Sequence, residues 1–536
     1  MSTLEAGTSP VHLARQTSAR WSTVNAREAF AGVVTPLTYT FYFPGAERAT
    51  ARFWKDLGLL ERTAADDPDN PDQRFFGVFH GRMAINVDRY GEMANRTPGT
   101  SAAALEEQMF GVARSGVGMG ATRRRYPMVA LTAPGTVYRA RRDTLRDFAA
   151  IPQWRRTWLT RLREADPATA RAAFRDARAR LETVLYRHIM LTAATQGLYE
   201  AAGKLAHRAG HPGAESEIVA SSSGTDEAHM IDALRKVAAG AATMDSFLAD
   251  YGFHGPDEGH LNATVWRQDP APLHALLERY RAAGERDQHG AAEARAIQRA
   301  NRTTEVLIGL SPIQRPLARG VLRAAGAMPV LREQGKAQFL QVVDVGRAAS
   351  MALGAHLIEA GQLDTADDVF YLTADELLTG DIDQAAISKR RGDHTEFLRT
   401  DLPIAWNGEP NPIPVRERAA PDAGRTEAGT SVTGLGVSAG TARGRVRIMH
   451  QLSDDDFDVD DILVCHTTDP SWASIMAIAA GLVIDVGGAI SHGAIVAREL
   501  GIPCVIATAT GTQQLRDGDY VEVSGSAGTV TVLDQS

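Results

Sequence analysis

The sequence has few cysteines, few lysines and no long apolar run. Cys465 and Cys504 are its only cysteines, too few for a disulfide framework, so a reducing, cytoplasmic location is expected. No run of about 18 apolar residues occurs, and a membrane-spanning helix is therefore not expected. Residues 1–19 mix Ser, Thr and Arg without an apolar stretch, which predicts a disordered tail and not a signal peptide.

The sequence also lacks a basic block and a nucleotide-binding phosphate loop. The formal net charge is −8, so neither nucleic acid nor a membrane is expected as a partner. No Gly-x-x-x-x-Gly-Lys stretch is found. Hydrophobic residues make up 44% and charged residues 23% of the 536 positions. These values are typical of a globular protein, and the length allows several domains.

One glycine-rich stretch near the C-terminus carries the most chemical information. An apolar run, Ala480–Ile484, predicts a buried strand. Gly487-Gly488 then allows a tight turn that a ligand can approach closely, and Ser491 is a candidate N-cap for a short helix over Ala494–Leu500. His492 would therefore lie at a helix N-terminus, which favours anions. It could carry a phosphoryl group there; the alternative is a neutral surface histidine beside an ordinary turn.

Segments on both sides of this stretch make its pattern specific. Gly487–Pro503, with Thr468–Trp472 before it and Leu515–Asp519 after it, resembles the phosphohistidine motif of the phosphoenolpyruvate-utilising enzymes. This family includes phosphoenolpyruvate synthase, pyruvate phosphate dikinase and rifampicin phosphotransferase. The resemblance implies a small, swivelling α/β phosphohistidine domain over residues 434–536. It makes His492 the phosphoryl carrier, with Gly488 and Ser491 in the binding turn.

The N-terminal part of the chain resembles the acceptor-binding domain of the rifampicin phosphotransferases. The resemblance lies in the Val-Thr-Pro-Leu-Thr sequence at Val34–Thr38 and implies that Thr35 binds substrate. We expect an acceptor-binding domain over residues 20–405, mixed over 20–140 and mainly helical over 141–405. Residues 406–433 are rich in Pro and Gly and predict a linker. The expected fold class is α+β multidomain: a largely helical domain followed by the small α/β domain.

A loop at Tyr251–Gly259 is a second candidate site. It interrupts a helical pattern and places His, Asp and Glu together, although an ordinary polar turn has the same composition. The family resemblance implies a substrate-binding role for Glu258. The family has a His-Arg pair where this chain has Phe253-His254, so His254 is only a second candidate base.

A third candidate lies at Leu331–Lys336. Arg332, Glu333 and Lys336 are spaced to share a helix face, and the alternative is a solvent-exposed ion pair. The resemblance implies that they match the Arg-Glu-x-x-Lys group that lines the acceptor site in the family. Arg332 and Lys336 would neutralise the transferring phosphoryl group. Glu333 would bind a metal ion, with Mg²⁺ as the candidate, or act as a base.

Two further segments have structural interpretations. Ser221–Glu227 predicts a loop with several candidate N-caps. Asp368–Leu377 predicts a strand followed by a capped helix.

Three functions remain open at the level of sequence. No segment resembles the ATP-grasp domain of the rifampicin phosphotransferases, so ATP or phosphoenolpyruvate would act only through a partner, a separate ATP-grasp protein. The first function is phosphoryl transfer through His492 to a hydroxyl of a medium-sized, natural-product-like molecule. The second is a phosphate-independent dehydration, cyclisation or rearrangement of such a molecule in the large domain, without a cofactor. The third is noncatalytic binding of a small molecule.

Overall fold

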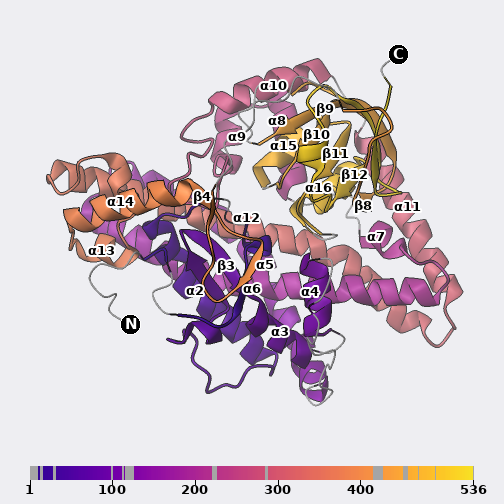
Figure 1. Ribbon diagram of the computed structural model, residues 1–536, viewed down its shortest axis with the longest axis horizontal. Helices are drawn as coiled ribbons and strands as arrows, with labels where there is room; N and C mark the ends of the chain where they lie inside the picture. Colours follow the sequence, from indigo (N-terminus) through magenta and orange to yellow (C-terminus); the bar gives the residue numbers. More distant parts are fainter. Residues whose placement is uncertain are drawn as a thin grey trace. The chain divides into compact units, whose positions relative to one another are not determined.

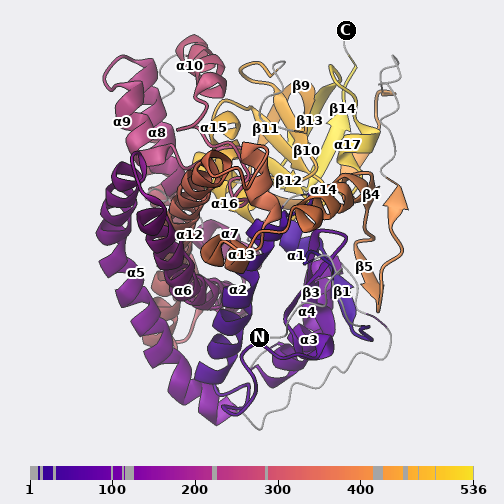
Figure 2. The same ribbon diagram turned by 90° about the vertical axis from the view of Figure 1, so that its left-hand side faces the viewer.

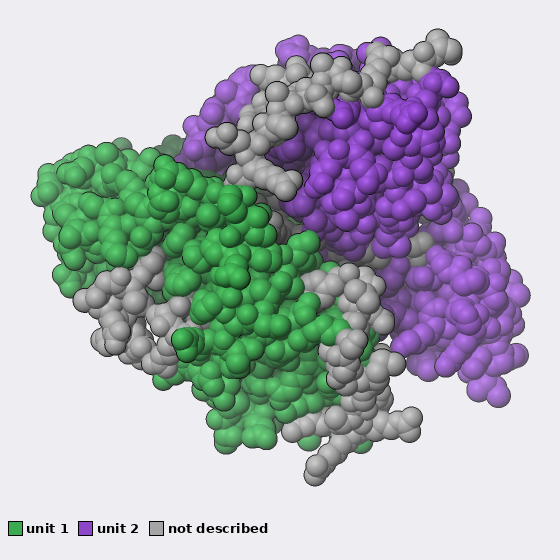
Figure 3. Space-filling model, in the orientation of Figure 1, with its two compact units in different colours: residues 1–190, 257–263, 335–417 green, residues 191–256, 264–334, 418–536 purple. Residues whose placement is uncertain are grey.

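The structure is a computed structural model that forms two compact units, shown in separate colours in Figure 3. It describes residues 10–12, 16–27, 30, 32–97, 100–110, 114, 126–219, 226–283, 288–414, 426–450, 457–468, 470–488 and 491–534. Unit 1 comprises residues 1–190, 257–263 and 335–417, and unit 2 comprises residues 191–256, 264–334 and 418–536. Much of the predicted tail and part of the predicted linker lie outside the described residues.

Unit 1 contains a small antiparallel sheet in the order β2-β3-β1-β5. Its strands are β1 (Arg20–Ser22), β2 (Phe76–Phe79), β3 (Arg82–Asn86) and β5 (Ala405–Asn407). His80 and Gly81, with positive φ angles of 47° and 68°, form the turn between β2 and β3. Trp21 and Trp406 pair across β1 and β5 and are both buried. The first residues of the predicted linker therefore belong to this sheet.

Long helices supply the main core of unit 1. They are α2 (Pro36–Asp56), α5 (Tyr126–Leu162), α6 (Pro167–Arg208) and α12 (Arg315–Glu359), and Figure 2 shows them side-on. Phe41, Ile151, Phe174 and Val343 each come from a different one of these helices and share one buried cluster. The division between the units falls inside α6 and α12. The remaining helices before α5 are α1 (Val24–Arg27), η1 (Pro71–Gln73), α3 (Val87–Arg96) and α4 (Ala102–Phe110).

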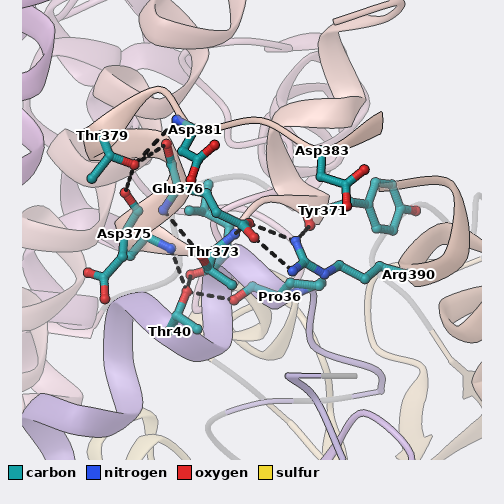
Figure 4. A network of polar contacts seen from close by, with 12 residues as sticks. Pro36, Thr40, Tyr371, Thr373, Asp375, Glu376, Thr379, Asp381, Asp383 and Arg390 are labelled. Carbon is teal, nitrogen blue, oxygen red and sulfur yellow. Dashed lines mark hydrogen bonds and ion pairs between the residues drawn. The ribbon is translucent and has the colours of Figure 1, made fainter. Parts of the chain in front are cut away.

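The segment expected to hold a strand before a capped helix contains two helical elements and no strand. It forms η3 (Ala366–Tyr371) and α13 (Ala374–Thr379), followed by α14 (Gln384–Leu398) and the paired strands β4 (Thr400–Asp401) and β6 (Ile413–Pro414). The strand prediction was wrong because Asp368 accepts a hydrogen bond from the Thr365 amide at 2.8 Å, which closes a turn. The capped helix is confirmed. Thr373 and Glu376 form its capping box, and Arg390 binds the Glu376 carboxylate (Figure 4).

Unit 2 combines short helices with a mixed sheet. Its helices are α7 (Ala214–Val219), α8 (Asp226–Ala238), α9 (Met244–Tyr251), α10 (Ala271–Ala283), α11 (Gln288–Gly309), η4 (Pro470–Trp472), α15 (Ala473–Met476), α16 (His492–Leu500) and α17 (Gly511–Gln514). Its strands are β7 (Ser431–Thr433), β8 (Leu435–Ser438), β9 (Thr441–Met449), β10 (Ile462–Cys465), β11 (Gly481–Ile484), β12 (Cys504–Ile506), β13 (Tyr520–Ser524) and β14 (Thr529–Val532).

The sheet has the order β7-β14-β13-β9-β10-β11-β12-β8. Figure 1 labels β8, β9, β10, β11 and β12 of this sheet. Strands β9, β10, β11 and β12 are parallel neighbours, and the other pairings are antiparallel. Strands β10, β11 and β12 are almost wholly apolar, as strands covered on both faces are. The alternating or apolar sequences of Arg445–Met449, Ile462–Cys465 and Thr529–Leu533 indicate strands, and β9, β10 and β14 lie there.

Helices α8, α9 and α10 share a hydrophobic core with α15, α16 and the parallel strands. Leu234 and Tyr280 from the helices join Met476 and Ala494 in one buried cluster. Unit 2 thus includes these helices together with the sheet, whereas the sequence predicted a domain boundary at the linker, residues 406–433. The mobility of the C-terminal domain stays a prediction. The expected fold class, a mostly helical region followed by a mixed α/β domain, is confirmed. In the part of the chain that the structure describes, no helix has the length and apolar character to cross a membrane.

Candidate functional site

His492 is the first residue of α16, which follows the turn after β11. Ser491 has the extended conformation of an N-cap, and its hydroxyl accepts a hydrogen bond from the Ala494 amide at 3.5 Å. The helix thus begins at His492, two residues earlier than predicted. It ends, as predicted, at Leu500, and the C-cap Gly501 has a left-handed φ of 70°. The predicted relation between His492 and a helix N-terminus is confirmed.

The two glycines of the turn have different surroundings. Gly487 has a φ of 151°, and an added Cβ would overlap the Ile506 side chain. By contrast, an added Cβ on Gly488 would meet no atom within 4 Å. Gly487 is therefore required by the backbone, while the described surroundings of Gly488 leave space above the turn.

A buried carboxylate supports the base of the turn. Asp485, directly after β11, accepts a hydrogen bond from the Thr508 hydroxyl at 2.7 Å and another from the Thr512 hydroxyl. Burial alone would raise the pKa of the Asp485 carboxyl, but hydrogen bonds from His466, Thr512 and Thr508 outweigh it and lower that pKa. Asp485 is therefore held as an anion that ties the end of β11 to the start of α17.

Two carboxylates lie beside His492. Glu227 at the start of α8, Glu333 on α12 and His492 each offer one ligand atom, and these atoms all lie within 4.8 Å of one another. The three side chains are buried, with exposed fractions of 4%, 1% and 3%. We call them the Glu-Glu-His cluster. All three residues belong to unit 2, and they can bind a cation or exchange protons.

Arg332 gives the cluster a positive neighbour. Its Nη1 lies 3.2 Å from Glu333 Oε1, and its side chain is 11% exposed. The ion pair is therefore largely buried and is not the solvent-exposed pair considered as the alternative from sequence. It offsets part of the negative charge beside His492.

His254 lies near a different carboxylate. Its Nε2 is 3.4 Å from Asp226 Oδ2, and the imidazole is buried against Phe253 and Trp266. Asp226 precedes Glu227 at the N-terminus of α8. Burial raises the pKa of the Tyr251 hydroxyl, and the negative charge of Asp226 raises it further. A carboxylate that orients an imidazole is the usual arrangement of a histidine base.

The other predicted site residues fall in unit 1. Lys336 is half-buried near the middle of α12. Glu258 is buried, and its backbone carbonyl accepts a hydrogen bond from Arg347 at 2.7 Å. Thr35 is the N-cap of α2, where its hydroxyl accepts from the Thr38 amide at 3.3 Å. This cap gives Thr35 a structural role, and the substrate-binding roles of Thr35 and Glu258 stay predictions.

Glu227 is the site residue that sequence reasoning missed. It ends the segment predicted as a loop with several N-caps, of which Ser221–Thr225 lies outside the described residues. A signal was present in the consecutive acids Asp226 and Glu227 at a helix start. Such acids are common there because they complement the helix dipole, so sequence alone could not mark Glu227 as part of a site.

Comparisons with known families identify the two parts of unit 2 that meet at this cluster. Residues 457–528 match the PEP-utilising enzyme, mobile domain, and residues 194–333 match the rifampicin phosphotransferase fourth domain. The first match contains His492 and the second contains Glu227, Arg332 and Glu333. The chain thus carries a mobile domain of the phosphoenolpyruvate-utilising type together with a rifampicin phosphotransferase fourth domain, and the resemblance predicted from the sequence is confirmed.

Curated relatives support this assignment over more than half of the chain. Chondramide synthase from Chondromyces crocatus is 31% identical over 54% of this chain and 8% of its own length. Rifampicin phosphotransferase from Streptomyces sviceus is 29% identical over 59% of this chain and 37% of its own. The Bacillus subtilis rifampicin phosphotransferase is 29% identical over 57% of this chain and 36% of its own. The match thus spans less than two fifths of each relative.

Proposed function

We propose that the protein is a phosphotransferase component in which His492 carries a phosphoryl group to a hydroxyl of an organic acceptor. The observation that carries the proposal is the place of His492, buried at the N-terminus of α16 beside the Arg332–Glu333 pair. Backbone amides at a helix start bind phosphoryl oxygens. The matched mobile domain supports the same role for this histidine.

Transfer would take place in two steps that regenerate the histidine. In the first, an imidazole nitrogen forms a P–N bond as the bond between the phosphoryl group and its donor breaks, and the electron pair leaves with the donor. In the second, the acceptor oxygen forms a P–O bond as the P–N bond breaks. The hydroxyl proton passes to a base, for which Glu333 and the Asp226-oriented His254 are the candidates. Arg332 would offset part of the phosphoryl charge, and the role of Lys336 there stays a prediction.

The proposed acceptor is a medium-sized, natural-product-like molecule, and the proposed donor is a separate ATP-binding protein. Relatives named rifampicin phosphotransferase and chondramide synthase support an acceptor of this class. Mg²⁺ is the ion expected with ATP.

Product formation by His492 variants tests the proposal. The full chain would be combined with ATP, a candidate ATP-grasp protein and hydroxyl-bearing macrocycles, and phosphorylated product measured by mass spectrometry. His492→Ala and His492→Gln should both abolish the product, because glutamine fills similar space without a nucleophilic nitrogen. Conversion of the acceptor at the parental rate by either variant would contradict the carrier role.

A phosphate-independent reaction is the second candidate function. The observation that favours it is the pair of buried carboxylates, Glu227 and Glu333, next to His492, because paired acids and bases can catalyse dehydration or cyclisation. Turnover without any phosphoryl donor, lost in Glu333→Gln, would favour this function. Binding of the same molecules without turnover under any phosphate supply would favour a noncatalytic binding protein.

A further inference from the structure

The Glu-Glu-His cluster places two carboxylates in a buried environment. Two carboxylates that are each less than 5% exposed lie beside His492, and the described ion pair with Arg332 supplies one positive charge. Burial of an anion is costly unless a cation or a proton compensates for it. A phosphoryl group on His492 would add up to about two further negative charges at the same place.

The donor atoms have the chemistry of a metal site. One imidazole nitrogen and two carboxylate oxygens lie within 4.8 Å of one another. Ligands of an ion bound at about 2.1 Å lie about 3 to 4 Å apart, so modest side-chain rotations would bring them to one ion. Glu333 Oε2 is buried and has no hydrogen-bond partner among the described residues, which leaves that oxygen available to a cation.

We propose that Glu227, Glu333 and His492 bind one divalent cation. Carboxylate oxygens suit Mg²⁺ and Mn²⁺ and imidazole suits Zn²⁺, so the mixed set favours Mn²⁺ or Zn²⁺ over Mg²⁺. The ion offsets the negative charge of the two carboxylates. On phosphorylation of His492, phosphoryl oxygens would replace the imidazole nitrogen at the ion, which would then hold the group for transfer. This task rests on the proposed function, whereas the ligand set rests on the geometry alone.

The three ligands lie in the two segments of the chain that match different families. The ion would therefore also affect stability. Glu227 and Glu333 belong to the fourth-domain segment and His492 to the mobile-domain segment. An ion that all three bind links the two segments within unit 2. Metal binding should therefore raise the melting temperature of the protein.

Metal titration of the full chain tests the site without any phosphoryl donor. We expect one Mn²⁺ or Zn²⁺ per chain by isothermal titration calorimetry. Glu227→Gln and Glu333→Gln should each weaken binding by about tenfold or more, while Glu305→Gln on α11, whose carboxylate pairs with Arg302 at 2.8 Å, should bind as the parent does. Unchanged affinity in both cluster variants would overturn the proposal, as would a folded parent that binds neither ion.

The imidazole ligand has its own spectroscopic signature. Electron spin echo measurements on the Mn²⁺-loaded parent should show coupling to a nitrogen nucleus, and His492→Gln should lose that coupling. Coupling that persists in this variant would overturn the role of His492 as a ligand. Neither readout depends on phosphoryl transfer. Failure of the proposed function would therefore leave the metal result intact, and failure of metal binding would leave the proposed function untouched.

Discussion

Glu333 and His492 lie far apart in the sequence, yet their ligand atoms approach within 4.8 Å inside unit 2. One comes from α12 in the fourth-domain segment and the other from the first position of α16 in the mobile-domain segment. The residue that the family resemblance assigned to the acceptor side thus lies beside the proposed phosphoryl carrier. This arrangement is what a transfer step requires, because donor and acceptor groups must meet in one place.

The cap of α16 should contribute measurably to stability. Ser491→Ala removes the hydroxyl that accepts from the Ala494 amide, so the free energy of unfolding should fall by about 1 kcal/mol. Urea titration followed by circular dichroism measures the change. Ser491→Asp retains a capping oxygen and serves as the control. Equal stability of Ser491→Ala and the parent would contradict a stabilising role for this cap.

The two turn glycines should respond differently to alanine. Gly487→Ala places a Cβ at a φ of 151° against Ile506 and should destabilise the protein by about 1 to 3 kcal/mol. Gly488→Ala meets no atom within 4 Å and should melt like the parent. If Gly488 allows the phosphoryl group to approach the backbone, this second variant should lose phosphorylation while it stays folded. A Gly488→Ala protein that is phosphorylated normally would remove Gly488 from the binding turn.

Unit 1 should lose stability as the pH rises towards neutrality, because of Glu47. Burial raises the pKa of this carboxyl to about 7, although hydrogen bonds from the Phe75 and Phe76 amides oppose the rise. The folded-state pKa lies above the unfolded-state value, so the contribution is full below about pH 4.3 and is lost as the pH rises through about 7. Over that range the loss is about 4 kcal/mol.

Glu47→Gln should remove this pH dependence, since its amide keeps an acceptor for the two backbone amides but does not titrate. Urea unfolding of parent and variant at about pH 5 and about pH 8 isolates the contribution. The parent should lose more stability than the variant between these values. Parallel losses in the two proteins would show that Glu47 does not hold its proton in the folded state.

Limited proteolysis tests the predicted linker. Strands β5 and β7 occupy its two ends, which narrows the expected first cleavage to residues 408–430. Fragments should be identified by mass spectrometry at low protease ratios. Earlier cleavage within α8 or within the parallel strands would contradict the boundary, because those elements share one buried core.

Local patterns predicted the surroundings of His492 well, whereas tertiary packing decided the rest. The strand, the glycine turn, the Ser491 cap and the Gly501 end all depend on residues within one short stretch, where propensity and capping act directly. Glu227 joins the site only because α8 packs in the same core as α16. The strand expected at Asp368 failed because a side chain closed the backbone into a turn.

Direct mapping of phosphohistidine tests the central claim most closely. The full chain would be incubated with phosphoramidate, a small donor that needs no partner protein, and acid-labile phosphate located by mass spectrometry of peptides under alkaline conditions. We predict modification on the peptide that contains His492, absent in His492→Ala and reduced in Gly488→Ala. Modification of other histidines with none at His492, in the folded parent protein, would contradict the role of His492 as the phosphoryl carrier.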